Sequence, residues 1–211
     1  MKIELHNISK TFGENKVLDN INLEFTSGKV YSFIGRNGSG KSVLFKIISG
    51  FYKPTSGRVL FDGLDINKDI KIPPSTRTLI EGPSFIPNLS GYQNLKLLSD
   101  INKKIGKNEI YDALEKVNLF DDKDKLYYKY SLGMKQKLGL AQVLMEDPEV
   151  MILDEPFNGI ENESVKKLRE ILLEEKSRGK IILIATHIRE DISVLSDEIY
   201  EVDGTHVNRL I

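Results

Sequence analysis

Cysteine and tryptophan are absent from the sequence, and no apolar run in it is long. Without cysteine the chain cannot form disulfides, a zinc–thiolate site or a cysteine nucleophile. The longest apolar runs, residues 150–153 and 181–185, are far shorter than the ~20 residues that a membrane-spanning helix needs. Residues 1–6 also lack the long apolar stretch of a signal peptide. If the protein works at a membrane, we therefore expect it to act from one side.

Positive and negative charges almost balance, because 30 Lys and Arg stand against 31 Asp and Glu, a formal net charge of −1. No broad basic surface is expected to attract nucleic acid, so we expect no nucleic-acid partner. Phosphate groups would have to be bound by a local site. The 211 residues, 40% hydrophobic and 29% charged, fit one globular domain rather than a disordered chain. We assign that single domain to residues 1–211.

Hydrophobic periodicity predicts two kinds of strand. Apolar and polar residues alternate over residues 3–5 and 21–25, which is typical of half-buried antiparallel strands. Residues 30–34, 150–153 and 181–185 instead form continuous apolar runs. Such runs suit central parallel strands that are covered on both faces.

Helical spacing accounts for much of the remaining chain. Apolar residues recur at helical spacing over residues 165–172, between the last two apolar runs, which indicates a βαβ crossover. Ile110, Leu114 and Val117 recur in the same way within a segment, about residues 83–145, that holds no long β-type run. The pattern therefore predicts an α/β core with antiparallel strands before it and a helical part inserted into it.

A glycine-rich segment matches the phosphate-loop motif G-x-x-x-x-G-K-[ST] at every fixed position. Glycines let successive backbone N–H groups point at phosphate oxygens, and the following helix offers its N-terminus to the same anion. Lys41 is suited to reach the β- and γ-phosphates, and the Ser42 hydroxyl is suited to ligate Mg²⁺. The motif alone fits a kinase, a GTPase or an ATPase. We expect the nucleotide to be bound by Gly35, Arg36, Asn37, Gly38, Ser39, Gly40, Lys41, Ser42 and Val43.

Acidic residues and a histidine follow the two later apolar runs. Asp154, at the end of residues 150–153, is suited to hold Mg²⁺ directly or through water. Glu155 is suited to polarise a water molecule for attack on a γ-phosphate, and His187 to contact that phosphate or hold the water. The alternatives are a solvated acidic turn and a surface histidine. Together with the phosphate loop, the pattern favours catalytic roles for Glu155, His187 and Lys41.

Residues 130–137, Tyr-Ser-Leu-Gly-Met-Lys-Gln-Lys, resemble the signature of the ATP-binding cassette family, usually Leu-Ser-Gly-Gly-Gln followed by x-Gln-Arg. Ser131 and Gly133 match this pattern, whereas Leu132, Met134 and Lys137 depart from it. The resemblance extends along nearly the whole chain. It implies an α/β fold with a P-loop NTPase core and a mainly parallel sheet, an N-terminal antiparallel β subdomain, and a helical subdomain inserted at about residues 83–145. We expect the helix that follows the signature to span residues 135–146.

The resemblance also implies a head-to-tail dimer, in which each nucleotide lies between the phosphate loop of one subunit and the signature of the other. Ser131, Gly133 and Met134 would then bind the nucleotide of a second cassette subunit, in a homodimer or a heterodimer. A hydroxyl and a glycine backbone at a helix N-terminus suit a γ-phosphate. Phe12 stands where an aromatic ring stacks on adenine, and Val17 would flank the same base.

Two glutamates stand where most family members have other residues. Glu81 replaces a glutamine that links the Mg²⁺ and water site to the helical subdomain, so the resemblance implies Ser42, Glu81 and Asp154 as Mg²⁺ ligands. Glutamate only accepts hydrogen bonds and adds a charge, whereas glutamine also donates. Glu161 replaces the usual aspartate and is one methylene longer, so the family's contact across the dimer is expected to change here.

Glu81, the Ser-Leu-Gly-Met of the signature and residues 88–95 resemble the bacitracin and lantibiotic export and immunity branch. The resemblance implies an ATPase that uses ATP and Mg²⁺ to drive export of an antimicrobial peptide or related drug, and so confers antibiotic resistance. A separate membrane-spanning permease would carry the cargo. The chain would then be cytoplasmic and peripheral on the inner face of the cell membrane. The alternatives are a soluble cassette ATPase of DNA repair, chromosome structure or translation, and a small-molecule kinase.

Overall fold

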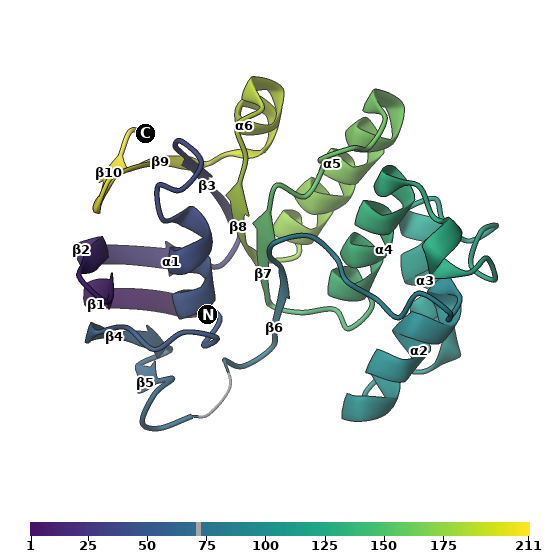
Figure 1. Ribbon diagram of the computed structural model, residues 1–211, viewed down its shortest axis with the longest axis horizontal. Helices are drawn as coiled ribbons and strands as arrows, with labels where there is room; N and C mark the ends of the chain where they lie inside the picture. The colour runs from purple at the N-terminus through teal and green to yellow at the C-terminus, as the bar shows by residue number, and fades with distance from the viewer. Residues whose placement is uncertain (71–72) are drawn as a thin grey trace.

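Two β-sheets organise the structure, a computed structural model that describes residues 1–70 and 73–211 (Figure 1). The first sheet is antiparallel, with strand order β2-β1-β4-β5. Ile3 lies opposite Phe25 in this sheet, and both side chains are buried, as their alternation with polar residues predicts. The antiparallel N-terminal subdomain is thereby confirmed. Its strands are β1 (Lys2–Phe12), β2 (Asn15–Thr26), β4 (Ser56–Phe61) and β5 (Leu64–Asp65).

The second sheet is mainly parallel and has the strand order β10-β9-β3-β8-β7-β6. Only β10 runs antiparallel to its neighbour among the described strands of this sheet. Because β3, β8 and β7 are adjacent and parallel, their carboxyl ends meet at one edge of the sheet. Its strands are β3 (Lys29–Ile34), β6 (Thr76–Leu79), β7 (Val150–Asp154), β8 (Ile181–Ala185), β9 (Glu198–Asp203) and β10 (His206–Arg209).

Helices cover both faces of the parallel strands, which explains their continuous apolar runs. Val150 and Ile152 of β7 belong to a core with Leu44 of α1 (Lys41–Ile48), whereas Met151 and Leu153 belong to the core on the opposite face. Figure 1 shows α1 beside the antiparallel sheet and α4 and α5 on the other side of the molecule. The α/β core of the sequence analysis is thereby confirmed.

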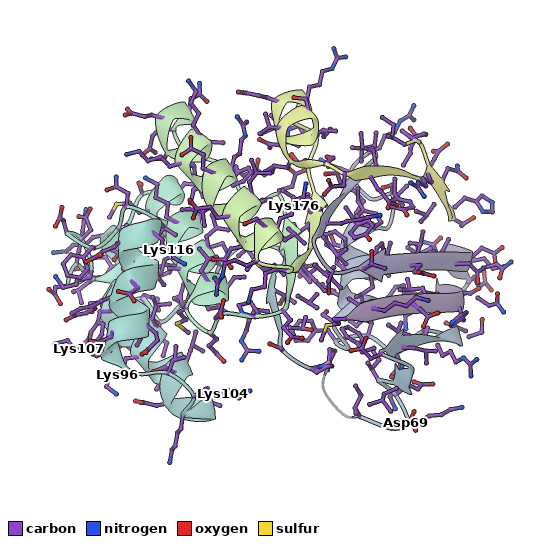
Figure 2. All side chains as sticks on the ribbon, turned by 180° about the vertical axis from the view of Figure 1, so that it is seen from behind. Asp69, Lys96, Lys104, Lys107, Lys116 and Lys176 are labelled. Carbon is purple, nitrogen blue, oxygen red and sulfur yellow. The ribbon has the colours of Figure 1, made fainter. Side chains whose placement is uncertain are left out.

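A helical layer is inserted between β6 and β7 (Figure 1). Seen from behind, Lys96, Lys104 and Lys107 lie along its outer edge (Figure 2). Within the described residues, no helix is long and apolar enough to cross a membrane. The layer consists of α2 (Gly91–Asn102), α3 (Lys107–Lys116), the short 3₁₀ helix η1 (Tyr127–Lys129) and α4 (Leu132–Leu144). The other two helices are α5 (Asn162–Ser177) and α6 (Arg189–Leu195).

The helix that carries the signature begins earlier than its sequence predicts. We expect it at residues 135–146, but α4 starts at Leu132 and ends at Leu144. The Ser131 hydroxyl accepts a hydrogen bond from the Met134 N–H at 3.2 Å and so caps the first turn. Glycine inside that turn has a low helix propensity, which is why the sequence pattern favours a later start.

A buried ionic network holds the segment that follows β8. Arg169 of α5 donates two hydrogen bonds to one carboxylate oxygen of Asp191 on α6, at 2.8 and 2.5 Å. The other oxygen of Asp191 accepts a hydrogen bond from the Thr186 hydroxyl at 3.0 Å. The same hydroxyl accepts the Ile188 N–H at 3.1 Å. Because Asp191 is only 1% exposed, this network fixes the residues on either side of His187.

Replacing Asp191 tests how much this network contributes. Asp191→Ala leaves the buried guanidinium of Arg169 without its main partner, and we expect it to lower the free energy of unfolding by about 3 kcal/mol. Urea unfolding monitored by circular dichroism measures the change. Glu190→Ala is the matched control, because Glu190 pairs with Arg169 but is 63% exposed, so its loss is expected to cost under about 1 kcal/mol. Equal losses for the two variants would contradict the network.

Candidate active site

The phosphate loop connects β3 to α1 and depends on glycine at defined positions. Gly35, Gly38 and Gly40 have φ angles of +146°, +80° and +105°, a region that side chains disfavour. A Cβ atom on Gly35 would collide with the carbonyl oxygen of Val202 on β9. The loop can therefore curl against the neighbouring strand only because Gly35 has no side chain.

Several polar groups of this loop are placed to bind an anion. Gly40 caps α1 without any side-chain hydrogen bond, so the first N–H groups of the helix remain available. The Ser39 hydroxyl oxygen is buried, and it is the one such side-chain atom in the described residues without a hydrogen-bond partner. Lys41 is 8% exposed and donates to the carbonyl oxygens of Gly35 at 2.7 Å and Arg36 at 3.0 Å. An ammonium has three donors, so one remains for a phosphate oxygen.

Ser42 and Asp154 form the second part of the site. The Ser42 hydroxyl donates to the Asp154 carboxylate at 2.5 Å, across a separation of 112 residues in the sequence. Hydroxyl and carboxylate oxygens are ligands that Mg²⁺ prefers. Within the described residues, no group of three His, Asp or Glu side chains converges on one metal position. A hydroxyl and a carboxylate beside a phosphate loop fit Mg²⁺, which commonly also binds substrate phosphates and water.

Glu155 and His187 lie beside this pair. The Nδ1 atom of His187 is 2.9 Å from Oε1 of Glu155, and the Glu155 N–H donates to the Ala185 carbonyl at 2.9 Å. Gln136 of α4 donates to the Glu155 carbonyl oxygen at 3.1 Å. Glu155 has a φ of +47°, an unfavourable conformation for a residue with a side chain. These hydrogen bonds hold it there, so its carboxylate points to the same edge of the sheet as Asp154.

Most of the expected residues line one cavity of about 620 Å³. It brings together Phe12, Val17, Asn37, Gly38, Ser39, Gly40, Lys41, Ser42, Val43, Glu81, Asp154 and Glu155. Gly35, Arg36 and His187 are linked to it by the contacts above rather than by lining it. Sequence reasoning missed Gly82, Leu132, Gln136 and Asn158, which also line the cavity. Gln136 is the glutamine of the signature pattern, so the motif contained the signal for it.

Phe12 lies at the mouth of the cavity. Its ring is 44% exposed and makes an edge contact with Tyr52 at a centroid distance of 5.7 Å. The Lys10 ammonium lies 4.8 Å from the centroid of the Phe12 ring. An exposed aromatic ring beside a phosphate cradle is available for stacking on a base.

Part of the signature faces the same cavity as the phosphate loop, because Leu132 and Gln136 line it. Neither Ser131 nor Gly133 nor Met134 lines the cavity, and Ser131 is exposed at the start of α4. Gly133 packs against the segment after β7, because a Cβ atom there would lie 2.6 Å from the Gly159 carbonyl oxygen. The N-terminus of α4 therefore lies at the edge of the nucleotide cavity, with Ser131 exposed, and is suited to bind an anion.

Both unusual glutamates form ion pairs within the chain. Glu81 lines the cavity, but its carboxylate lies 2.5 Å from the Lys46 ammonium on α1. Glu161 lies 2.7 Å from the Lys137 ammonium and also accepts the Ser164 hydroxyl at 2.8 Å. The hydrogen bond from Lys137 lowers the pKa of Glu161 to about 2. Glu161 is thus held by its own subunit at the start of α5.

Comparison with known proteins identifies the family. The sequence model of the family described as ABC transporter matches residues 18–158, more than half of the chain. The chain belongs to this family. It is the ATP-binding subunit of an ABC transporter and hydrolyses ATP.

Curated relatives resemble the chain over nearly its whole length. It is 40% identical to an uncharacterized ABC transporter ATP-binding protein, YybJ of Bacillus subtilis, over 95% of this chain and 92% of the relative. It is 37% identical to the bacitracin transport ATP-binding protein BcrA of Enterococcus faecalis, over 97% of this chain and 67% of that protein. It is 36% identical to the lantibiotic transport ATP-binding protein SrtF of Streptococcus pyogenes, over 92% of this chain and 84% of that protein. The resemblance to this branch is thereby confirmed.

A solved structure supports the fold. A nucleotide-free ATP-binding cassette from an ABC transporter is 26% identical in sequence, with a TM-score of 0.84. The match covers 99% of this chain and 92% of that one. The fold class expected from the sequence is therefore confirmed.

The close contact at Gly35 predicts the effect of a single methyl group. Gly35→Ala would push the phosphate loop away from β9, and we expect it to weaken ATP binding at least about tenfold, or about 1.4 kcal/mol. Equilibrium dialysis with labelled ATP measures the affinity. Gly63→Ala is the control, because Gly63 has a φ of +83° but nothing within 4 Å of its would-be Cβ, and it lies away from the cavity. Undiminished affinity in Gly35→Ala would contradict the assigned cradle.

Proposed function

We propose that this ATPase drives the export of an antimicrobial peptide or a related drug through a separate membrane-spanning permease. The names of BcrA and SrtF, bacitracin transport and lantibiotic transport ATP-binding proteins, support the class of cargo. The observation that carries the motor function is the convergence of Ser42, Asp154 and Glu155 on one phosphate-sized cradle. We further propose that residues 1–211 are a single nucleotide-binding domain with its helical subdomain at about residues 83–145.

The roles of the chain's own residues follow from their chemistry. Lys41 and the N–H groups of the phosphate loop bind the phosphates of ATP. Ser42 and Asp154 would hold Mg²⁺, with Glu81 as a further ligand, and the ion would neutralise charge on the phosphates. Glu155 accepts the proton of the attacking water, and His187 orients that water or the γ-phosphate.

A second cassette subunit would complete the site. We propose that Ser131, Gly133 and Met134 of one subunit bind the nucleotide held by the phosphate loop of the other, in a homodimer or a heterodimer. The exposure of Ser131 at the N-terminus of α4 supports this arrangement, since a helix N-terminus that is open to a partner is suited to bind an anion. Phe12 and Val17 would contact the adenine base. Hydrolysis would then remove the γ-phosphate that joins the two subunits.

A groove next to the nucleotide cavity fits a short helix of the permease. It consists of two adjoining cavities, of about 570 and 450 Å³, that share Phe51, Thr78 and Gln142. Phe51 is 67% exposed and Ile101 72% exposed, which is unusual for large apolar side chains. Amphipathic helices commonly bind in apolar grooves of this kind. Binding there would place the chain on the inner face of the cell membrane.

The proposed general base is tested by Glu155→Gln. The amide cannot accept the proton of the attacking water, so we expect ATP hydrolysis to fall by about 10²-fold or more, while ATP binding persists. The variant should form a dimer that depends on ATP, because the joining γ-phosphate is no longer removed. Phosphate release and size-exclusion chromatography measure the two properties. Hydrolysis at the wild-type rate would remove Glu155 from this role.

The groove is tested in membranes of the source organism. Affinity-tagged chain is purified from solubilised membranes, and we expect a multi-spanning polypeptide to copurify with it. Phe51→Glu places a charge in the groove and should reduce recovery of that polypeptide roughly tenfold, the effect of losing one buried phenylalanine. Leu64→Glu is the control, because Leu64 is 50% exposed on β5, outside the groove. Equal recovery with both variants would exclude this groove as the binding site.

A further inference from the structure

Glu81 is placed where it can face either of two cations. Its side chain lines the nucleotide cavity together with Ser42 and Asp154, the residues suited to Mg²⁺. Its carboxylate nevertheless lies 2.5 Å from the Lys46 ammonium. Lys46 stands one helical turn after Ser42 on α1, so the two residues point along the same side of that helix.

Lys46 reaches Glu81 from the neighbouring groove. The Lys46 side chain is 17% exposed and lines the groove with Phe51 and Tyr52. Its ammonium lies 5.2 Å from the centroid of the Tyr52 ring, which favours the charged form. The hydrogen bond to Glu81 raises the pKa of Lys46. Gly82 lines both the groove and the nucleotide cavity, so the ion pair forms part of the wall between them.

The backbone at this wall is strained. Glu81 and Gly82 have φ angles of +62° and +78°, two successive left-handed residues. A left-handed conformation is unfavourable for a residue with a side chain. Such a conformation persists only where surrounding contacts hold it, and it is common at switch segments. The ion pair with Lys46 is the contact that holds the Glu81 side chain.

We propose that Lys46 is a positioning residue that competes with Mg²⁺ for the carboxylate of Glu81. Without nucleotide, Lys46 holds Glu81 against α1. When Mg·ATP occupies the cavity, Glu81 leaves Lys46 and turns to the metal, and the wall of the groove changes with it. A glutamine at position 81 would have no charge to exchange between the two cations, so the device depends on glutamate.

The inference rests on the proposed Mg·ATP site and adds a regulation of it. Because the ion pair and the metal draw on the same carboxylate, each weakens the other's hold on it. The Mg²⁺-dependent part of nucleotide affinity therefore reports the strength of the Lys46–Glu81 pair. This quantity is the ratio of the dissociation constant in EDTA to that in excess Mg²⁺, which we name the magnesium enhancement. Because free ATP is more negative than Mg·ATP, loss of a lysine charge changes this ratio by itself, and the Glu81→Gln background measures that part separately.

The test measures the magnesium enhancement for a fluorescent, non-hydrolysable ATP analogue. Lys46→Met frees Glu81 for the metal, and we expect the enhancement to rise about fivefold, or about 1 kcal/mol. Lys46→Arg keeps the charge and should retain most of the wild-type value. In a Glu81→Gln background the Lys46→Met substitution should raise the enhancement much less, because only the general effect of the lost lysine charge remains. The two substitutions thus form a double-mutant cycle whose coupling is the predicted quantity.

The controls separate this inference from the site itself. Lys176, labelled on α5 in Figure 2, forms an ion pair with Asp197 at 2.6 Å and is also partly buried, so Lys176→Met should not change the enhancement. Thermal unfolding checks that each variant is folded. If the wild type shows no magnesium enhancement, the proposed metal site is wrong. If the wild type shows it and Lys46→Met leaves it unchanged, or raises it equally in the Glu81→Gln background, the competition is wrong and the metal site stands.

Discussion

The parallel pairing of β3, β8 and β7 is the constraint on which the site depends. Phe33 lies opposite Ala185, and Ala185 lies opposite Asp154, so the three strands end at the same level. The phosphate loop starts directly after β3. The acidic pair, Asp154 and Glu155, lies at the end of β7, and His187 lies two residues after β8. A slip of one residue in β7 would turn Asp154 to the opposite face and remove it from Ser42. Such a slip would also exchange the residues that β7 contributes to the two cores, since Val150 and Ile152 pack into one core and Met151 and Leu153 into the other.

Strain in the backbone is concentrated where these ends meet. Glu155 and Glu81 both adopt left-handed conformations, although each has a side chain. Hydrogen bonds from Glu155 to Ala185 and from Gln136 to Glu155 hold the first, and the ion pair with Lys46 holds the second. The hydrogen bonds of Glu155 join it to two buried residues, Ala185 and Gln136. Glu81 lies at the wall of the cavity, and its side chain is held by one exchangeable ion pair with Lys46. Glu81 is therefore freer to move than Glu155.

The sequence predicts those parts of the structure that local pattern determines. Continuous apolar runs indicate β7 and β8 because burial on both faces leaves no polar position, and the glycine motif indicates the cradle because the required φ angles exclude side chains. The sequence pattern does not predict the start of α4 at Leu132. The Ser131 hydroxyl caps the helix there, although the glycine in its first turn has a low helix propensity. The partners of Glu81 and Glu161, 35 and 24 residues away in the sequence, are not predictable from local pattern. Only the packing of α1 and α4 against the strands brings those lysines near.

Charge balance explains why the two unusual glutamates are compatible with binding a polyphosphate. Glu81 adds a negative charge at the wall of the cavity, where it would repel a phosphate, and Glu161 adds one at the start of α5. Each is paired within the chain with a lysine, Lys46 or Lys137, so the added charge is locally neutralised. For Glu161 the pairing is tight enough to lower its pKa to about 2, and the carboxylate is committed to holding α5 against α4. Lys46 reaches Glu81 from the groove on the other side of the cavity wall. The carboxylate of Glu81 can therefore be neutralised either by Lys46 or by Mg²⁺. An added glutamate charge therefore has a structural consequence at position 161 and a regulatory one at position 81.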